Sequence, residues 1–389
     1  MPLKLRRALR SDAEALTDIM QRSKASWGYT PEQAALIKQH DHVTRDQIAG
    51  QHVIVAERDG QPVAYLAVEP MDAETLLIDH IFVCPDHQGN GLGKLLLLRA
   101  EDHARQHRLS RLYLISDVHA GSFYEKHGFE TVGTIPSKLV PGHFAPEMEK
   151  RLKPNVHELQ DLSLTVSEDG WAFETQNKAE IDTYFKAAQQ RIPLLWNGRT
   201  LKLTGYAFAD GRFHGTCTEC SYAAFLTWRD WGAPDLTTHN LFGSAILRSK
   251  EGHLLFGVMS ERTATAGQIY PPGGNLDPDD VTAGGSVDVR GAIYRELQEE
   301  TGLQRNDVVP GSLLVAFDGP RISIAQVFDI HRPADELRTS ILTHSEASEE
   351  QELSDVRIIR SPADLNDPAI VPYARYCALH LLEKASAKA

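Results

Sequence analysis

The chain has 389 residues, of which 42% are hydrophobic and 24% charged, so it is long enough for two or three ordinary globular domains. Its formal net charge of −13 argues against a nonspecific nucleic-acid binder or a binder of anionic membranes. Four cysteines are too few for a disulfide framework of this size, which favours a reducing, cytoplasmic location.

The N-terminal region begins without an apolar leader. Its first ten residues are basic and no apolar run follows them, so we expect no signal peptide. Every stretch long enough to cross a membrane contains charges, so we expect no membrane span. Alternating and apolar patterns then predict four strands followed by an amphipathic helix, at residues 3–5, 51–58, 62–68, 76–83 and 95–106.

A glycine-rich turn, Gln88-Gly89-Asn90-Gly91-Leu92-Gly93, connects the fourth of these strands to the helix. The N–H groups of such a turn and of the helix N-terminus present partial positive charge to an anion, so the segment predicts a diphosphate cradle. The alternative is an ordinary turn between a strand and a helix. The run matches the Gln/Arg-any-any-Gly-any-Gly/Ala pattern of GNAT-type N-acetyltransferases. A second segment, Ala120 to Phe129, is similar to the Ala-any-any-Phe-Tyr-Glu-Lys-any-Gly-Phe segment of that family.

The resemblance implies a mixed-sheet GNAT domain over residues 1–152 that transfers acetyl from acetyl-CoA to an amine. It makes Tyr124 the general acid for the CoA thiolate, although Tyr124 also suits a packed aromatic role. The general base is expected at Asp79 or His80, with Asp79 preferred. Asp117 stands where the family often has Asn. The resemblance assigns the acetyl-CoA site to Val83, Gln88, Gly89, Asn90, Gly91, Leu92, Gly93 and Lys94.

The pattern changes at Lys153, where a polar run indicates a boundary. Residues 153–240 are predicted to form a lead-in to the C-terminal domain, with a hairpin over 162–166 and 170–175 and a helix over 180–191. Cys217 and Cys220 form a single Cys-any-any-Cys pair. Structural zinc needs four ligands and no second pair follows, so we interpret these cysteines as incidental.

Residues 241–389 are predicted to form an α/β core in which a helix ends at Gly302. This helix carries Glu296, Glu299 and Glu300, whose spacing of i, i+3 and i+4 puts all three on one face. Three like charges on one face favour a hard divalent cation such as Mg²⁺ or Mn²⁺; the alternative is a solvated acidic helix. The predicted strands cover residues 241–249, 253–260, 312–318, 323–330 and 357–359, and a last helix covers 374–387.

The run from Arg295 to Leu303 resembles the second half of the Nudix box, Arg-Glu-apolar-any-Glu-Glu-any-Gly-apolar. Nudix enzymes hydrolyse a nucleoside diphosphate linked to another group. The resemblance implies Mg²⁺ or Mn²⁺ bound by Glu296, Glu299 and Glu300, with Glu299 counted as catalytic. The first half departs from the pattern, because Val287 stands where Glu is usual and residues 275–283 are inserted.

The lead-in and the insertion resemble those of UDP-glucose-type Nudix hydrolases, at Leu195 to Gly198, Ser221 to Leu226 and Pro272 to Asp280. A nucleotide sugar is therefore the expected substrate. Hydrolysis of CoA is the less favoured interpretation. An acidic run before the last strand is another possible source of a metal ligand or base. Its members are Glu346, Glu349, Glu350 and Glu352, and the sequence does not choose among them.

Together these patterns predict an α/β (α+β) fold of two domains, a GNAT mixed-sheet domain followed by a Nudix α/β/α sandwich with an N-terminal extension. The expected protein is a bifunctional enzyme acting on two small molecules, an amine and a nucleoside diphosphate derivative, with no nucleic-acid or membrane partner. A homodimer is left open. The alternative is one active domain regulated by the other, with the GNAT domain as a CoA-binding sensor.

Overall fold

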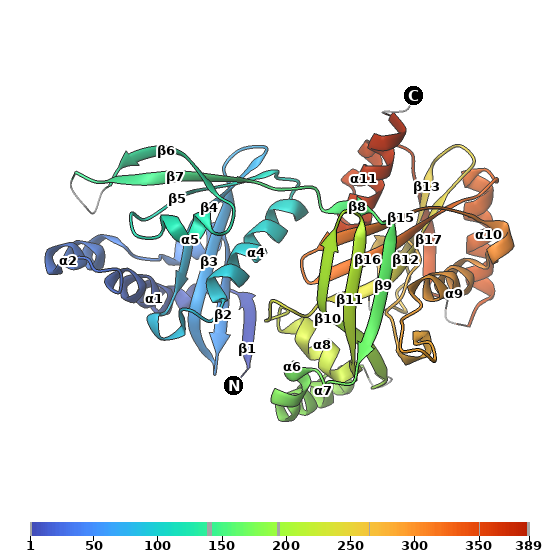
Figure 1. Cartoon of the computed structure of the whole chain (residues 1–389), viewed down its shortest axis with the longest axis horizontal. Coiled ribbons are helices and arrows are strands. Elements are labelled where there is room, and N and C mark those ends of the chain that lie inside the picture. The colour runs from blue at the N-terminus through green and yellow to red at the C-terminus, as the bar shows by residue number, and fades with distance from the viewer. Residues whose placement is uncertain (1, 138–141, 193–194, 264, 350, 387–389) are drawn as a thin grey trace. The chain divides into compact units, whose positions relative to one another are not determined.

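The computed structural model describes residues 2–137, 142–192, 195–263, 265–349 and 351–386. Contacts between residues divide the chain into two compact units (Figure 1). The first unit comprises residues 1–153 and 227–236, and the second comprises residues 154–226 and 237–389. The short range 227–236 lies far along the chain from the rest of its unit, and the sequence patterns had not separated it from the lead-in.

The first unit contains a seven-stranded sheet in the order β1-β2-β3-β4-β5-β7-β6. Neighbouring strands are antiparallel except β4 and β5, which are parallel. The strands are β1 (Leu3–Arg7), β2 (His52–Arg58), β3 (Gln61–Pro70), β4 (Thr75–Val83), β5 (Arg111–Ile115), β6 (Glu130–Pro136) and β7 (Phe144–Arg151). The helices are α1 (Ala13–Ala25), α2 (Pro31–His40), α3 (Arg45–Gly50), α4 (Leu92–Gln106) and α5 (Gly121–Glu125).

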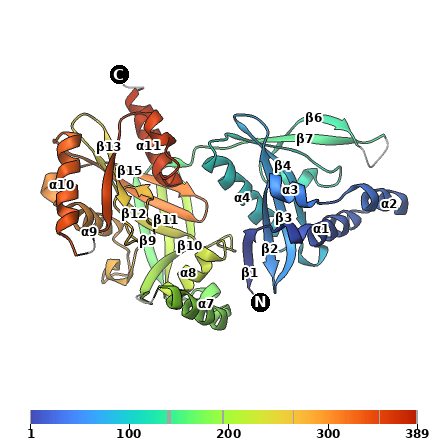
Figure 2. The ribbon, with the colours of Figure 1, turned by 180° about the vertical axis from the view of Figure 1, so that it is seen from behind.

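Helices cover both faces of this sheet (Figure 2). On one face α4 buries apolar side chains such as Leu96 and Ala100 against Leu66 and the neighbouring strand residues. On the other face α1 buries side chains including Leu16 against Tyr65. Apolar positions recur at helical spacing in α4 and alternate along the strands, and this pattern makes the two-sided packing possible.

The second unit contains two sheets. The larger has seven strands, in the order β14-β13-β12-β16-β15-β8 with β17 also paired to β13, and the smaller has the order β10-β11-β9. Their bounds are β8 (Val156–Glu158), β9 (Asp161–Ser167), β10 (Arg199–Ala209), β11 (Arg212–Ser221), β12 (Asn240–Arg248), β13 (Leu254–Met259), β14 (Ile269–Tyr270), β15 (Val309–Asp318), β16 (Arg321–Asp329) and β17 (Leu353–Ile359).

Helices and the smaller sheet enclose the larger sheet. Helices α9 (Val289–Thr301) and α10 (Ala334–Ala347) pack on one face together with the smaller sheet, and α11 (Pro372–Ser386) packs on the other. Two further helices of this unit are α6 (Ala172–Gln176) and α7 (Lys178–Arg191), and α8 (Tyr222–Asp230) has its residues from Thr227 onward in the first unit. The whole chain is therefore a mixed α/β protein. Among the described helices, none is long and apolar enough to cross a membrane.

The predicted hairpin over residues 162–166 and 170–175 is wrong. Strand β9 instead pairs in parallel with β11, and the second segment forms helix α6. The cause is Trp171, whose indole N–H donates to the Thr238 hydroxyl at 3.0 Å while its ring is buried. Burying this ring and satisfying its N–H group requires long-range contacts, which local alternation does not reveal.

Candidate functional site

The glycine-rich turn between β4 and α4 has an open, cradle-like backbone. Gly89 and Gly91 have φ values of +77° and +78°, a left-handed conformation that favours glycine. The Gln88 amide closes the loop by donating to the Val83 carbonyl at 3.1 Å. Helix α4 starts directly after Gly91, so the N–H groups of its first turn lack carbonyl partners within the helix. This arrangement suits a diphosphate.

The remaining residues predicted for the cradle divide by exposure. The Leu92 side chain is buried in the core, whereas Asn90 and Lys94 are exposed. A Cβ atom at Gly93 would lie 3.0 Å from Cζ of Phe123 on α5. The lack of a side chain at Gly93 therefore brings α5 against the start of α4, beside the turn.

The parallel strands β4 and β5 separate next to this turn. Their pairing ends at Leu77 and Tyr113, although β4 continues to Val83 and β5 to Ile115. The remaining residues of β4 and β5 form no ladder with each other. Asp79 and His80 lie on the β4 side of this opening, and Tyr124 follows β5 on α5.

Tyr124 is buried within the core of the first unit, and its hydroxyl makes no hydrogen bond to any described part of the chain. Burial raises the pKa of Tyr124, and the charge of Asp117 raises it further. The hydroxyl therefore stays protonated across the physiological range. A thiol has a much lower pKa, so this hydroxyl is better suited to donate a hydrogen bond to a thiolate than to give up its proton.

Asp117 is held at the end of β5 by two donors. The Tyr29 hydroxyl donates to one carboxylate oxygen at 2.5 Å, and the His119 N–H donates to the other at 3.0 Å. Tyr29 also packs edge-on against the His119 ring, with 5.0 Å between centroids. Asp117 therefore places a negatively charged carboxylate beside Tyr124, whereas an Asn at this position would be neutral.

A β-bulge changes the faces of Asp79 and His80. Ala67 pairs with His80 and Val68 pairs with Ile78, so Asp79 is the extra residue. The bulge reverses the alternation and turns His80 toward the α1 side, 5.8 Å from the Tyr65 ring. Burial lowers the pKa of His80, so its imidazole is neutral at pH 7 and can accept a proton. Asp79 is exposed and accepts from the Gln51 amide at 2.9 Å.

In the second unit, four glutamates line a cavity of about 110 Å³. They are Glu296, Glu299 and Glu300 from α9 and Glu352 from the segment before β17. The i, i+3, i+4 spacing thus places its carboxylates at one cavity. Within the acidic run, Glu346 and Glu349 are exposed, Glu350 lies outside the described residues, and Glu352 reaches the cavity.

A glycine pair lies directly against these glutamates. The Gly273 N–H donates to Glu300 Oε1 at 2.7 Å, and a Cβ at Gly274 would lie 2.3 Å from Glu296 Oε1. Burial, together with the charges of neighbouring carboxylates, raises the pKa of Glu296 to about 7 and that of Glu300 to about 8. The enclosed carboxyls therefore bind protons near neutral pH.

The predicted metal site is not found in this geometry. Carboxylate oxygens suit Mg²⁺ or Mn²⁺, but among the described residues no three His, Cys, Asp or Glu side chains are arranged to hold one ion. Val287, which replaces the usual Glu, is a buried core residue. Arg295 pairs chiefly with Asp280 from the insertion, at 2.5 Å, and more distantly with Glu296 at 3.5 Å. The partner Asp280 was missed because no local pattern links it to α9.

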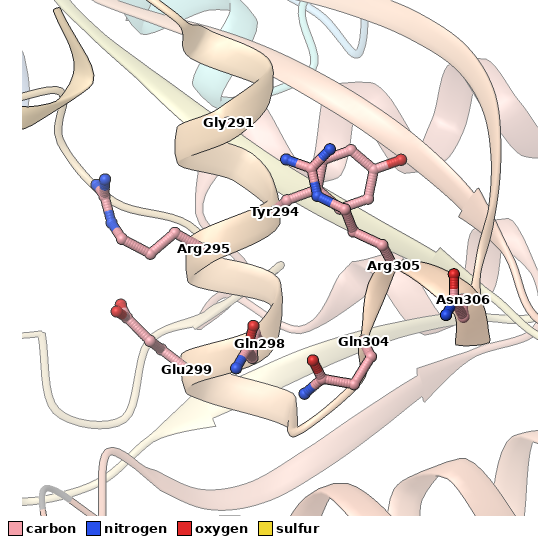
Figure 3. A pocket seen from close by; sticks show the side chains of 8 residues that line it. All are labelled: Gly291, Tyr294, Arg295, Gln298, Glu299, Gln304, Arg305 and Asn306. Carbon is pink, nitrogen blue, oxygen red and sulfur yellow. The ribbon is translucent and has the colours of Figure 1, made fainter.

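A larger hollow of about 470 Å³ lies on the outer side of α9 (Figure 3). The side chains of Tyr294 and Arg305 lie together on one side of the helix, and those of Arg295 and Glu299 lie on the other. The lining residues are Gly291, Tyr294, Arg295, Gln298, Glu299, Gln304, Arg305 and Asn306. Glu299 lines both this hollow and the acidic cavity.

Comparison with known proteins identifies part of the first unit. Residues 14–129 match the sequence model of the Acetyltransferase (GNAT) family, so this segment is a GNAT acetyltransferase domain. The Nudix resemblance of the second unit rests on its sequence motif.

Several solved structures are similar to 39% of the chain. PaiA N-acetyltransferase from Thermoplasma acidophilum in complex with coenzyme A is 18% identical, with all of that chain covered and a TM-score of 0.34. A GCN5-related N-acetyltransferase from Rhodopseudomonas palustris is 23% identical, with 97% covered and a TM-score of 0.34. N-acetylglutamate synthase from Neisseria gonorrhoeae, complexed with coenzyme A and N-acetyl-glutamate, is 19% identical, with 36% covered and a TM-score of 0.30.

Proposed function

We propose that the first unit transfers an acetyl group from acetyl-CoA to an amine. The observation that carries the proposal is the left-handed turn at Gly89 and Gly91, which leads from the unpaired half of β4 into the N-terminus of α4. A family match over residues 14–129 supports it. The turn would bind the pyrophosphate of acetyl-CoA, and the separated strands would receive its thioester end.

Three side chains near the opening would have different roles in the reaction. His80 is neutral at pH 7 and would take a proton from the amine, directly or through water. Asp79, with its carboxylate 3.9 Å from His80 Nε2, would favour the imidazolium that forms. The Tyr124 hydroxyl would donate a hydrogen bond to the departing thiolate, which stabilises charge that develops during the reaction.

A titration of the full chain with acetyl-CoA tests this function directly. We expect saturable binding and release of free thiol when an accepted amine is added. The paired substitution Gly89→Val and Gly91→Val forces a side chain into left-handed backbone and should abolish binding, whereas Gly60→Ala, at another turn with φ of +75°, should leave it intact. Absence of acetyl-CoA binding by the unmodified chain would reject the proposal. Binding without acetyl transfer to any amine would favour the sensor alternative.

A second function is proposed for the second unit, the hydrolysis of a nucleoside diphosphate derivative such as a nucleotide sugar. The specific observation in its favour is the acidic cavity, where the Gly273-Gly274 turn meets Glu296 and Glu300. Its run from Arg295 to Leu303 resembles the second half of the Nudix box, whereas the first half departs from the pattern. The protein would hold the carboxylates of this cavity close together in a site that is partly shielded from solvent.

A screen of nucleotide sugars, dinucleotides and CoA with added Mg²⁺ tests this function and its substrate class together. We expect Glu299→Gln to abolish hydrolysis while acetyl-CoA binding survives. Glu346→Gln, on the exposed end of α10, is the matched control and should keep full activity. Full hydrolysis by the Glu299→Gln protein would contradict the assignment.

A further inference from the structure

We propose that the hollow on the outer side of α9 is a binding site for the phosphate monoester of a polyhydroxylated small molecule, such as a sugar phosphate or a nucleoside monophosphate. The hollow has a volume of about 470 Å³, within the range of small-molecule sites. Its lining is polar along its whole length, from α9 to the segment at 304–306. An apolar ligand would leave these polar groups without hydrogen bonds, at a cost in free energy.

Arg305 supplies the anion-binding group. Its guanidinium lies over the Tyr294 ring, 4.1 Å from the centroid (Figure 3), so one face of the planar group is held while its N–H edges remain open. Arg305 has no carboxylate partner within the described residues. A guanidinium fork with open edges matches the oxygens of a phosphate in a bidentate fashion.

The rest of the lining suits hydroxyl groups. The amides of Gln298 and Asn306 make no hydrogen bonds within the described chain and carry both donors and acceptors. Glu299 adds an acceptor at one edge of the hollow. Arg295, by contrast, is fixed by the buried carboxylate of Asp280 and supplies mainly charge. The open guanidinium and the two amides suit a phosphate joined to several hydroxyls, while Glu299 lines the hollow across the helix from Arg305.

The proposed ligands are also the two products that hydrolysis of a nucleotide sugar would give, but the inference is tested by binding alone and requires no turnover. Glu299 also lines the acidic cavity, so a ligand in the hollow would lie next to that cavity. The test therefore avoids substitutions at Glu299, which belongs to the proposed hydrolytic site. Its result stands whether or not the second unit proves to be a hydrolase.

The experiment is calorimetric titration of the full chain with glucose 1-phosphate and with UMP, beside glucose and inorganic phosphate as partial ligands. We expect one of the two phosphate esters to bind at least about tenfold more tightly than either partial ligand, because both groups contribute contacts. Arg305→Ala should weaken that binding by roughly tenfold or more, as loss of a charge-assisted contact does. Tyr294→Phe should keep most of the affinity, because the ring that holds the guanidinium remains.

The matched control is Arg332→Ala, which removes the same charge from a partly exposed arginine paired with Glu336 at 2.8 Å. It should leave the affinity unchanged. Equal weakening by Arg305→Ala and Arg332→Ala would show general charge attraction and overturn the proposal. Failure of both esters to bind, or binding of inorganic phosphate as tight as that of the esters, would also overturn it. Arg305 is exposed, and an unchanged melting temperature would confirm that its substitution leaves the fold intact.

Discussion

Replacing Glu300 with Gln should stabilise the protein above neutral pH when divalent cations are absent. The Glu300 carboxyl is enclosed by protein and accepts the Gly273 N–H at 2.7 Å. Burial, together with the charges of Glu352 and Glu296, raises its pKa to about 8. Ionisation therefore places an unfavourable charge in the cavity. Gln has a similar shape, keeps an oxygen for Gly273 and never ionises.

The magnitude follows from the pKa difference between the folded and unfolded states. Each pH unit is worth about 1.4 kcal/mol, so a rise from 4.5 to about 8 corresponds to at most roughly 5 kcal/mol. Part of the side chain contacts solvent, and screening reduces the expected effect to about 2–3 kcal/mol. Because the pKa of Glu300 is raised in the folded state, the contribution of its protonated carboxyl to the free energy of unfolding is fully present below pH 4.5. This contribution is lost as the pH rises through 8.

The assay is urea unfolding at pH 5, 6.5 and 8.5 in buffer containing EDTA. The unmodified protein should lose stability across this series, and Glu300→Gln should lose less. Glu346→Gln, at an exposed position, should follow the unmodified protein. A stability of the unmodified protein that stays constant or rises from pH 5 to 8.5, or an equal slope for Glu300→Gln, would refute the reasoning.

Three further predictions concern single side chains. Tyr124→Phe should lower kcat for acetyl transfer by roughly 10- to 100-fold while the KM for acetyl-CoA changes little; steady-state kinetics decides, and an unchanged kcat contradicts the role. His80→Gln should lower kcat/KM by about tenfold or more and remove the low-pH limb of the rate profile. Asp79→Asn should lower kcat/KM only a few-fold. If Asp79→Asn has the larger effect, Asp79 is the base. Lys202 is fully buried, and burial lowers its pKa to about 8. The free energy of unfolding should therefore rise between pH 8 and 10.5 by up to roughly 3 kcal/mol. Chemical denaturation at pH 7.5 and 10 should show no such rise for Lys202→Met, and an equal rise would disprove the assignment.

The sequence predicted the features that depend on local spacing. The strand, glycine turn and helix around Gly91 need only a few consecutive residues, and the structure places β4, the turn and α4 accordingly. Glu296, Glu299 and Glu300 share a cavity because an α-helix brings positions i, i+3 and i+4 to neighbouring faces. Gly302 ends α9 with a φ of +75°, as a glycine C-cap does.

Features that depend on long-range pairing were beyond the sequence patterns. The bulge at Asp79 arises from pairing with β3, and simple alternation cannot show which residue is the extra one. Asp280 meets Arg295 only because the insertion folds back onto α9. Glu352 stands among several similar acidic residues, and the packing of β17 beside α10 brings it to the cavity. In each case the decisive partner is distant in sequence, so the local pattern is compatible with several arrangements.

The acidic cavity also constrains the pH at which the second unit can work. The missing side chain at Gly274 allows the turn to approach Glu296 more closely than any other residue would permit. Burial raises the pKa of Glu296 to about 7 and that of Glu300 to about 8. In the proposed activity, a divalent cation bound at these oxygens would have to displace the protons. The proposed hydrolytic activity should therefore increase across pH 7–8 at low Mg²⁺ concentration and depend less on pH when Mg²⁺ is saturating, because the cation displaces the protons.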